Sequence, residues 1–198
     1  MLCVETLATE LIGPVSLTVG VGDCAVITGP SGSGKSLLMR AIADLDPNTG
    51  QVRLGQQKRD QMPAWQWRQR VAMVPAETGW WTDRVRDHFD LAHDPLPMLE
   101  ALDLAPALDW EVSRLSTGER QRLGLVRALC RNPQAVLLDE PTAALDPAAT
   151  ERAEALIRDV IARGVPAVIV THDPAQSARL NAHRYRMDKG RLTPDPGK

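Results

Sequence analysis

Eight consecutive residues carry the strongest chemical signal in this 198-residue chain. They read Gly29-Pro30-Ser31-Gly32-Ser33-Gly34-Lys35-Ser36, which is the G-x-x-x-x-G-K-[ST] pattern of a phosphate-binding P-loop. Glycines let the backbone curl so that successive N–H groups face one anion, and a helix start adds its dipole and unpaired donors. The motif predicts a nucleotide site that extends to Leu37. In it, Lys35 reaches the β- and γ-phosphates and the Ser36 hydroxyl binds Mg²⁺.

Two carboxylates, Asp139 and Glu140, form a second candidate site directly after the apolar run 135–138. That run is typical of a buried strand, and ligands of open α/β sheets bind beyond the carboxyl ends of the strands. In a chain that also carries a P-loop, we expect Asp139 to help hold Mg²⁺ through its water shell. We expect Glu140 to polarise the attacking water as a general base.

A third element reads Ser116-Thr117-Gly118-Glu119. Its spacing predicts a capping box, with Ser116 at the N-cap, Glu119 three residues on, and a helix to about Arg131. Capping alone is a sufficient structural explanation of these residues. A serine and a glycine at a helix start also suit an anion. Because this helix start is not the one that carries the P-loop, it would complete a nucleotide site on another copy of the chain.

The elements that must position these residues alternate between strand and helix patterns. Strand-like runs occur at residues 15–19, 25–27, 51–55, 71–74, 135–138 and 165–170, of which 51–55 is expected to be a short edge strand. Helical spacing follows the P-loop and returns over residues 148–163. This alternation predicts an α/β fold with a mostly parallel sheet covered on both faces. From residue 76 to about 114, prolines and acids replace the strand signals, which predicts a small helical lobe.

Composition narrows the classes of function. The formal net charge of -2 argues against a nucleic-acid partner. Cys3, Cys24 and Cys130 are isolated in the sequence, so we expect reduced, buried thiols. No apolar run approaches the roughly 20 residues that span a bilayer, and the N-terminus lacks the pattern of a secretory signal. These features predict a cytosolic protein that needs a partner in order to work at a membrane.

In their order along the chain, these motifs resemble those of the ATP-binding subunits of ABC transporters. Residues 115–121 are similar to the family's signature, Leu-Ser-Gly-Gly-Gln, with Thr117 in place of a glycine and Glu119 in place of the glutamine. Residues 135–140 resemble the Walker B motif with its catalytic glutamate, and residues 143–146 resemble the D-loop. Thr171-His172-Asp173 follows an apolar strand, as the family's switch histidine does.

The resemblance implies a P-loop NTPase core with a mostly parallel sheet, antiparallel edge strands and a small helical subdomain. The whole of 1–198 would be one domain, with its core at 1–75 and 129–198 and the subdomain at about 76–128. It would dimerise head to tail, with a second copy or a homologous cassette, around two ATP molecules. Hydrolysis would drive a multi-span membrane permease, which would hold the cytoplasmic chain peripherally at the inner face of the membrane.

The resemblance also implies roles for single residues. Ser116, Thr117, Gly118 and Glu119 would contact the ATP bound by the opposite subunit. Asp146 would lie at the dimer interface, and His172 would contact the γ-phosphate.

Two positions depart from the family pattern. Ala76 stands where the family has a glutamine that helps bind Mg²⁺, so Glu77 or a water is expected to fill that role. Residues 1–21 lack the aromatic side chain on which many relatives stack adenine, so adenine is expected to rest on an aliphatic surface.

Several alternatives stay open at this stage. Trp80 and Trp81 either anchor a helix of the membrane subunit, as the resemblance suggests, or pack the helical lobe, whereas Trp65, Trp67 and Trp110 are expected to pack. The alternative functions are an ABC ATPase that acts on DNA or ribosomes and a weakly hydrolysing regulatory cassette.

Overall fold

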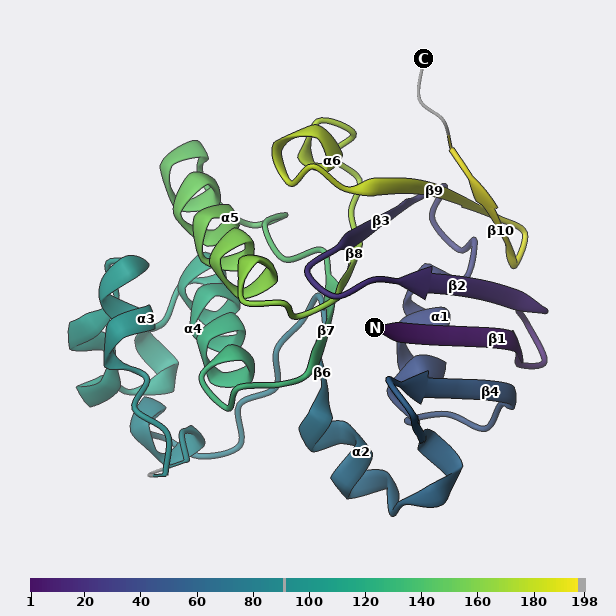
Figure 1. Cartoon of the computed structure of the whole chain (residues 1–198). Helices are drawn as coiled ribbons and strands as arrows, with labels where there is room; N and C mark the ends of the chain where they lie inside the picture. The colour runs from purple at the N-terminus through teal and green to yellow at the C-terminus, as the bar shows by residue number, and fades with distance from the viewer. Residues whose placement is uncertain (91, 196–198) are drawn as a thin grey trace.

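Two β-sheets and the helices packed against them form the molecule (Figure 1). The computed structural model describes residues 1–90 and 92–195. One sheet has six strands in the order β10-β9-β3-β8-β7-β6, and the other has four in the order β2-β1-β4-β5. No helix within the described residues is long and apolar enough to cross a membrane.

The six-stranded sheet is the centre of the fold. Its strands are β3 (Cys24–Thr28), β6 (Val71–Val74), β7 (Ala135–Asp139), β8 (Ala167–Val170), β9 (His183–Asp188) and β10 (Arg191–Pro194). All pairings from β6 to β9 are parallel, and β10 pairs antiparallel to β9 at one edge. The central strands β3, β8 and β7 are apolar and almost entirely buried, as expected for parallel strands covered on both faces. The carboxyl ends of these parallel strands therefore lie at one edge.

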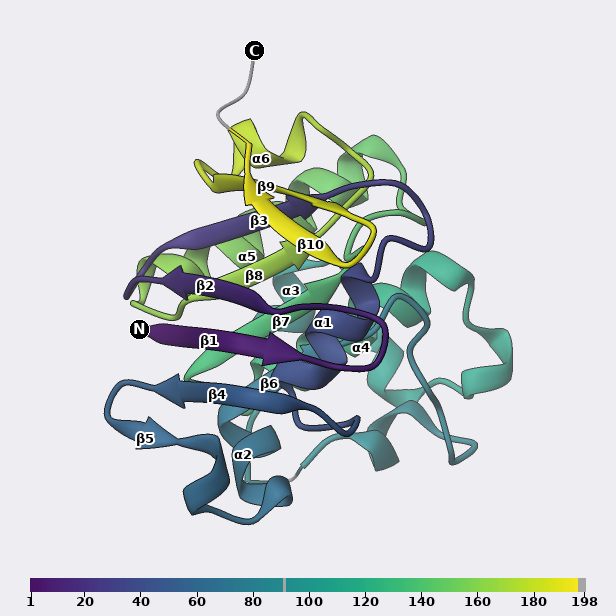
Figure 2. The same ribbon diagram turned by 90° about the vertical axis from the view of Figure 1, so that its right-hand side faces the viewer.

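The antiparallel sheet covers one face of this assembly. It contains β1 (Leu2–Ala8), β2 (Val15–Val19), β4 (Thr49–Leu54) and the two-residue β5 (Gln57–Lys58). Figure 2 shows β1, β2 and β4 in front of helix α1 (Lys35–Ile42). Buried side chains of β1, β2 and β4 join those of α1, β7 and β8 in a single cluster. Helix α1 is thereby packed between two sheets, which fixes the P-loop that precedes it.

The opposite face of the parallel sheet is covered by helices. These are α3 (Leu96–Ala101), α4 (Thr117–Leu129), α5 (Pro147–Ala162) and α6 (Gln176–Arg179), with the 3-10 turns η2 (Val85–His88), η3 (Ala105–Asp109) and η4 (Val112–Arg114). Turn η1 (Arg59–Gln61) and α2 (Ala64–Arg70) precede β6. Leu99 and Leu104 belong to the same buried cluster as Leu138 and Ile169 of the sheet. Residues of the segment 76–128 and of the sheet pack in one core cluster, so packing marks no boundary between them. The subdomain limits at about 76 and 128 therefore stay a prediction.

The predicted fold class is confirmed, with corrections to single strands, and β5, β9 and β10 are strands that were not predicted. Residues 51–55 were expected to form an edge strand, but β4 pairs with β1 on one side and β5 on the other. Strand β1 itself was not predicted. A register shift between Val4 and Leu7 interrupts the alternation of buried and exposed residues that would have indicated a strand.

The tryptophans of α2 separate into two environments. Trp67 is fully buried and its Nε1 donates a hydrogen bond to the Ile42 carbonyl at 2.9 Å, so its predicted packing role is confirmed. Trp65 is 57% exposed, so the packing role predicted for it is wrong. Residues two apart on a helix point to nearly opposite faces, and only one of the two faces the core. Trp110 is half-buried against the core cluster, as expected.

Replacing Trp67 with alanine should therefore destabilise the fold by about 3–5 kcal/mol, since it leaves a cavity and an unpaired carbonyl. The matched control is Trp65→Ala on the same helix, which should change the free energy of unfolding by less than about 0.5 kcal/mol. Urea denaturation of both variants gives the comparison. Equal effects of the two substitutions would contradict the burial described for Trp67.

Candidate nucleotide site

The P-loop connects β3 to α1 through a turn that only glycine permits at two points. Gly34 has φ 103°, and a Cβ there would lie 2.4 Å from Cγ2 of Ile12. A Cβ on Gly29 would lie 2.0 Å from the carbonyl oxygen of Met187. Either contact would displace a neighbouring element. The glycines therefore allow the loop to press against segments on two sides.

Lys35 lies along the loop that it closes. Its side chain is largely buried, and Nζ donates to the carbonyls of Gly29 at 2.8 Å and Pro30 at 3.0 Å. Ser33 Oγ is buried and has no hydrogen-bond partner among the described residues, while the Ser33 carbonyl accepts from Gly190 N–H at 3.0 Å. Ser36 is exposed at the start of α1. The loop thus holds a cation and one hydroxyl, Ser33 Oγ, that is unpaired within the described part of the chain, which suits a bound phosphate chain.

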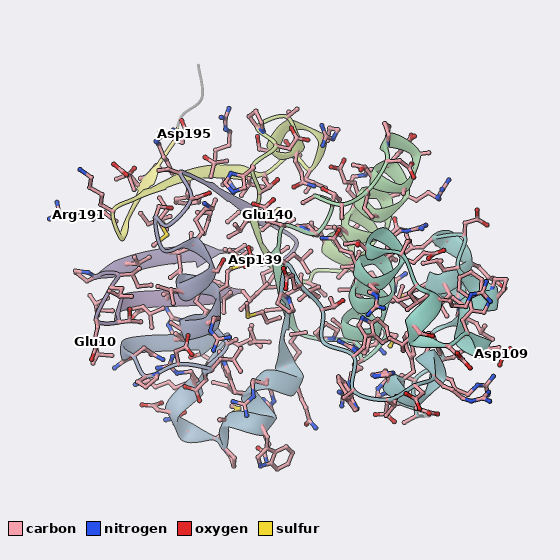
Figure 3. The ribbon with its side chains drawn as sticks, turned by 180° about the vertical axis from the view of Figure 1, so that it is seen from behind. Glu10, Asp109, Asp139, Glu140, Arg191 and Asp195 are labelled. Carbon is pink, nitrogen blue, oxygen red and sulfur yellow. The ribbon has the colours of Figure 1, made fainter. Side chains whose placement is uncertain are left out.

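Strand register brings the other motifs to the same edge. Ile27 of β3 pairs with Val170 of β8, and Val170 pairs with Asp139 of β7. The P-loop, Thr171-His172 and Glu140 each follow one of these three adjacent strands. Figure 3 shows Asp139 and Glu140 at the centre of the molecule. Asp139 is buried at the end of β7, with 5% of its surface exposed.

Glu140 is held in an unusual conformation beside His172. Its φ is 50°, in the left-handed region, and its N–H donates to the Val170 carbonyl at 2.9 Å. Its Oε2 accepts from the His172 N–H at 3.3 Å, and its Oε1 lies 3.4 Å from His172 Nε2. Burial raises the pKa of the Glu140 carboxyl, and the adjacent His172 opposes this in part. A half-buried carboxylate with a raised pKa suits a proton acceptor.

The predicted capping box at the start of α4 is confirmed. Glu119 N–H donates to Ser116 Oγ at 3.2 Å, and Ser116 N–H donates to Glu119 Oε2 at 2.8 Å. This hydrogen bond from the Ser116 backbone lowers the pKa of Glu119. Thr117 is exposed, and Gly118 lies against the carbonyl of Ala144. Within the part of the chain that the structure describes, no hydrogen bond joins residues 116–119 to the P-loop.

Gln121 connects this helix to the candidate catalytic loop, and sequence reasoning missed it. Its Nε2 donates to the Glu140 carbonyl, and its Oε1 accepts from the Ala144 N–H at 3.2 Å. Gln121 is buried, and Leu125, one helical turn later, is also buried. A polar residue on the apolar stripe of a helix is the signal that could have identified it.

Asp146, Ala76 and the N-terminal loop complete the set of predicted positions. Asp146 is the exposed N-cap of α5 and accepts from Ala149 N–H at 2.9 Å, which lowers the pKa of its carboxyl. Ala76 and Glu77 are exposed in the loop after β6, and the role of Glu77 stays a prediction. Leu11, next to the Ile12 that contacts the P-loop, is 74% exposed.

Comparisons with known proteins agree on one family. The sequence profile described as ABC transporter matches residues 12–143. The chain is 33% identical to the phosphonates import ATP-binding protein PhnC 1 of Rhodopseudomonas palustris (strain HaA2), over 81% of this chain and 67% of that protein. It is also 33% identical to the lipoprotein-releasing system ATP-binding protein LolD of Anaeromyxobacter dehalogenans, over 94% and 86% of the two chains.

Two solved structures share the fold. One, the ATP-binding subunit of an ABC transporter, superposes with a TM-score of 0.86 at 21% identity, over 98% of this chain and 90% of the other. A dimeric ATP-binding cassette in a post-hydrolysis state with ADP and Pi gives a TM-score of 0.81 at 23% identity, over 100% of both chains. With the profile match and the P-loop geometry, these similarities place the chain in the ABC transporter family, as an ATP-binding subunit that hydrolyses ATP.

Proposed function

We propose that this chain forms a head-to-tail dimer around two ATP molecules and that hydrolysis in the dimer powers a membrane permease. One observation supports the dimer above all. Lys35, Asp139, Glu140 and His172 gather at one edge of the sheet, whereas the Ser116 helix start makes no described hydrogen bond to the P-loop. A second chain, turned head to tail, would supply that helix start. The similar cassette with ADP and Pi is dimeric, which gives this arrangement a precedent in the fold.

In this proposal the P-loop residues 29–37 bind the phosphates of ATP. Lys35 would exchange its hydrogen bonds to the Gly29 and Pro30 carbonyls for the β- and γ-phosphate oxygens. Ser36 and Asp139 would hold Mg²⁺, which supplies neutralising charge beside the phosphates. The donor set fits a hard cation because it offers a hydroxyl in the loop and helix after β3 and a buried carboxylate at the end of β7, with β8 between the two strands. Leu11, which is 74% exposed, would provide the aliphatic surface for adenine.

Glu140 would accept the proton of the attacking water. Its Oε1 is buried and makes no hydrogen bond among the described residues, although it lies 3.4 Å from His172 Nε2, so it can accept the proton. The His172 N–H fixes the other carboxylate oxygen, and the imidazole would contact the γ-phosphate. Ser116, Thr117, Gly118 and Glu119 of the second subunit would face the same phosphate, and Asp146 would lie at the interface.

We place the permease partner at a surface hollow between α2, the loop after β6, and α4. Trp65 and Trp81 are 57% and 70% exposed and line a hollow of about 380 Å³. Trp80, by contrast, is half-buried and packs on the core cluster, so the two adjacent tryptophans differ in environment. Docking of a permease segment here would hold the chain at the inner face of the membrane. Both relatives named above carry transport names, which favours this reading over a DNA- or ribosome-associated ATPase.

Glu140→Gln should keep ATP binding but lower turnover about 10²–10⁴-fold, because an amide cannot accept the proton. The variant should also accumulate as an ATP-dependent dimer. Steady-state ATPase rates and size-exclusion chromatography with and without ATP measure these effects. Wild-type turnover in this variant would remove Glu140 from the mechanism.

The same substitution predicts a pH-dependent stability difference. Burial raises the pKa of Glu140 above its ordinary value of about 4.3, so folding loses stability as rising pH ionises the native carboxyl. Glu140→Gln removes this penalty. The variant should unfold at a higher temperature than wild type at pH 7, and the gap should close as the pH falls below about 4. Thermal melts across this range test the sign, with the exposed Glu151→Gln as a control. A gap that does not change with pH would contradict the burial argument.

A mixing experiment tests whether each ATP site is shared between two chains. Lys35→Ala and Ser116→Arg should each abolish hydrolysis alone, since each damages both sites of a symmetric dimer. In a mixed dimer one site keeps an intact Lys35 and an intact Ser116. An equal mixture should therefore recover roughly a quarter of wild-type turnover per chain if pairing is random and the sites act independently. No recovery on mixing, with heterodimers shown to form, would contradict the shared site.

A further inference from the structure

A buried carboxylate outside the proposed catalytic set lies between the two loops that carry Glu140 and His172. Glu154, on α5, has 1% of its surface exposed, yet both of its oxygens accept hydrogen bonds. Charged side chains are rarely buried this completely unless they are paired. The partners of Glu154 therefore indicate what this residue does.

Arg179 is the first partner, and it leads to the histidine loop. Its guanidinium donates two hydrogen bonds to Glu154, from Nε to Oε2 at 2.7 Å and from Nη2 to Oε1 at 2.8 Å. The same Nη2 donates to Asp173 Oδ2 at 2.6 Å, which lowers the pKa of that carboxyl. Asp173 follows His172 directly. Glu154 and Arg179 thus tie the backbone beside the switch histidine to α5.

Gln176 is the second partner, and it leads to the loop after Glu140. This residue is completely buried on α6, and its Nε2 donates to Glu154 Oε1 and to Thr142 Oγ1, each at 3.0 Å. Thr142 lies two residues after Glu140. A continuous chain of hydrogen bonds therefore runs from Thr142 through Gln176, Glu154 and Arg179 to Asp173.

Stability alone is a poor explanation for this chain of contacts. Only the glutamate of the Glu154–Arg179 pair is buried, since 39% of the Arg179 side chain is exposed, and an ion pair that removes a carboxylate from water contributes little net stability compared with well-packed apolar residues. A side-chain network does, however, hold its members in one geometry. Because this network ends beside Glu140 at one end and His172 at the other, the geometry that it holds is the one in which their side chains meet.

We propose that Glu154 and Gln176 are positioning residues for ATP hydrolysis, which hold the loops of Glu140 and His172 in register with each other. The proposal rests on the roles proposed above for those two residues. None of the described contacts of this network involves a P-loop residue, so the network should affect hydrolysis and not the binding of ATP. Loosening the network should therefore lower kcat and leave the affinity for ATP unchanged.

Glu154→Gln tests the centre of the network, and Thr142→Val tests its end beside Glu140. Glu154→Gln keeps the shape of the side chain but replaces one acceptor oxygen by an NH₂ group, which then faces the donors of Gln176 or Arg179. Thr142→Val keeps the shape and loses the hydroxyl. Each should lower kcat about 10- to 100-fold, the loss expected when catalytic groups are misplaced by about 1 Å. Thr142→Ser, which restores the hydroxyl, should recover most of the loss. Glu151→Gln, exposed one turn earlier on α5, is the matched control.

The measurements are kcat, KM, the dissociation constant of a non-hydrolysable ATP analogue, and the thermal midpoint of each variant. A fall in kcat at unchanged analogue affinity, reversed by Thr142→Ser, supports positioning. A lower thermal midpoint with wild-type kcat in Glu154→Gln and Thr142→Val overturns it and leaves a purely structural network. Glu140→Gln, assayed alongside, separates the two proposals. If Glu140→Gln loses turnover while Glu154→Gln and Thr142→Val keep it, the positioning proposal is wrong and the role of Glu140 stands. If Glu140→Gln keeps turnover, the role proposed for Glu140 is wrong, and the positioning proposal that rests on it is wrong too.

Discussion

The parallel pairing of β3, β8 and β7 is the constraint on which the rest of the structure depends. Ile27, Val170 and Asp139 are paired across three neighbouring strands, so the loops that follow leave the sheet side by side. The apolar core on both faces fixes that register, because a slip of one residue would turn buried side chains to the opposite face. Packing that looks unrelated to chemistry therefore sets which polar residues meet at the sheet edge.

Glu140 is held at this edge under local strain. A left-handed φ of 50° at a non-glycine residue costs on the order of 1 kcal/mol, and such conformations persist where the surroundings fix them. Here the Val170 carbonyl accepts from the backbone N–H of Glu140, and Gln121 donates to its carbonyl. Gln121 belongs to α4, whose first turn would face the ATP of a partner. The backbone of the proposed base is thus tied to the helix that would sense the second subunit.

The parts of the fold that follow simple periodicity were predictable from sequence. The apolar runs of β3, β7 and β8 and the Ser116 capping box were found where they were expected. The strands that were missed break the pattern for physical reasons. A register shift interrupts β1, and β9 (His183–Asp188) is rich in charged residues and buries only Met187 fully, although it pairs in parallel with β3. A polar segment such as β9, which shows no strand signal of its own, can therefore form a strand by pairing with a buried neighbour such as β3.

The site was predictable where its residues form contiguous motifs and not where they meet only in space. Lys35, Glu140 and His172 lie in local patterns that imply chemistry, whereas Glu154 and Gln176 come from two helices and gain their meaning from each other. Nothing in a single sequence states that α5 and α6 will approach. A weaker signal does exist, since a glutamate or glutamine on the buried stripe of a helix needs a partner. Such positions can be marked from sequence as members of a polar network, and the structure then supplies the partners.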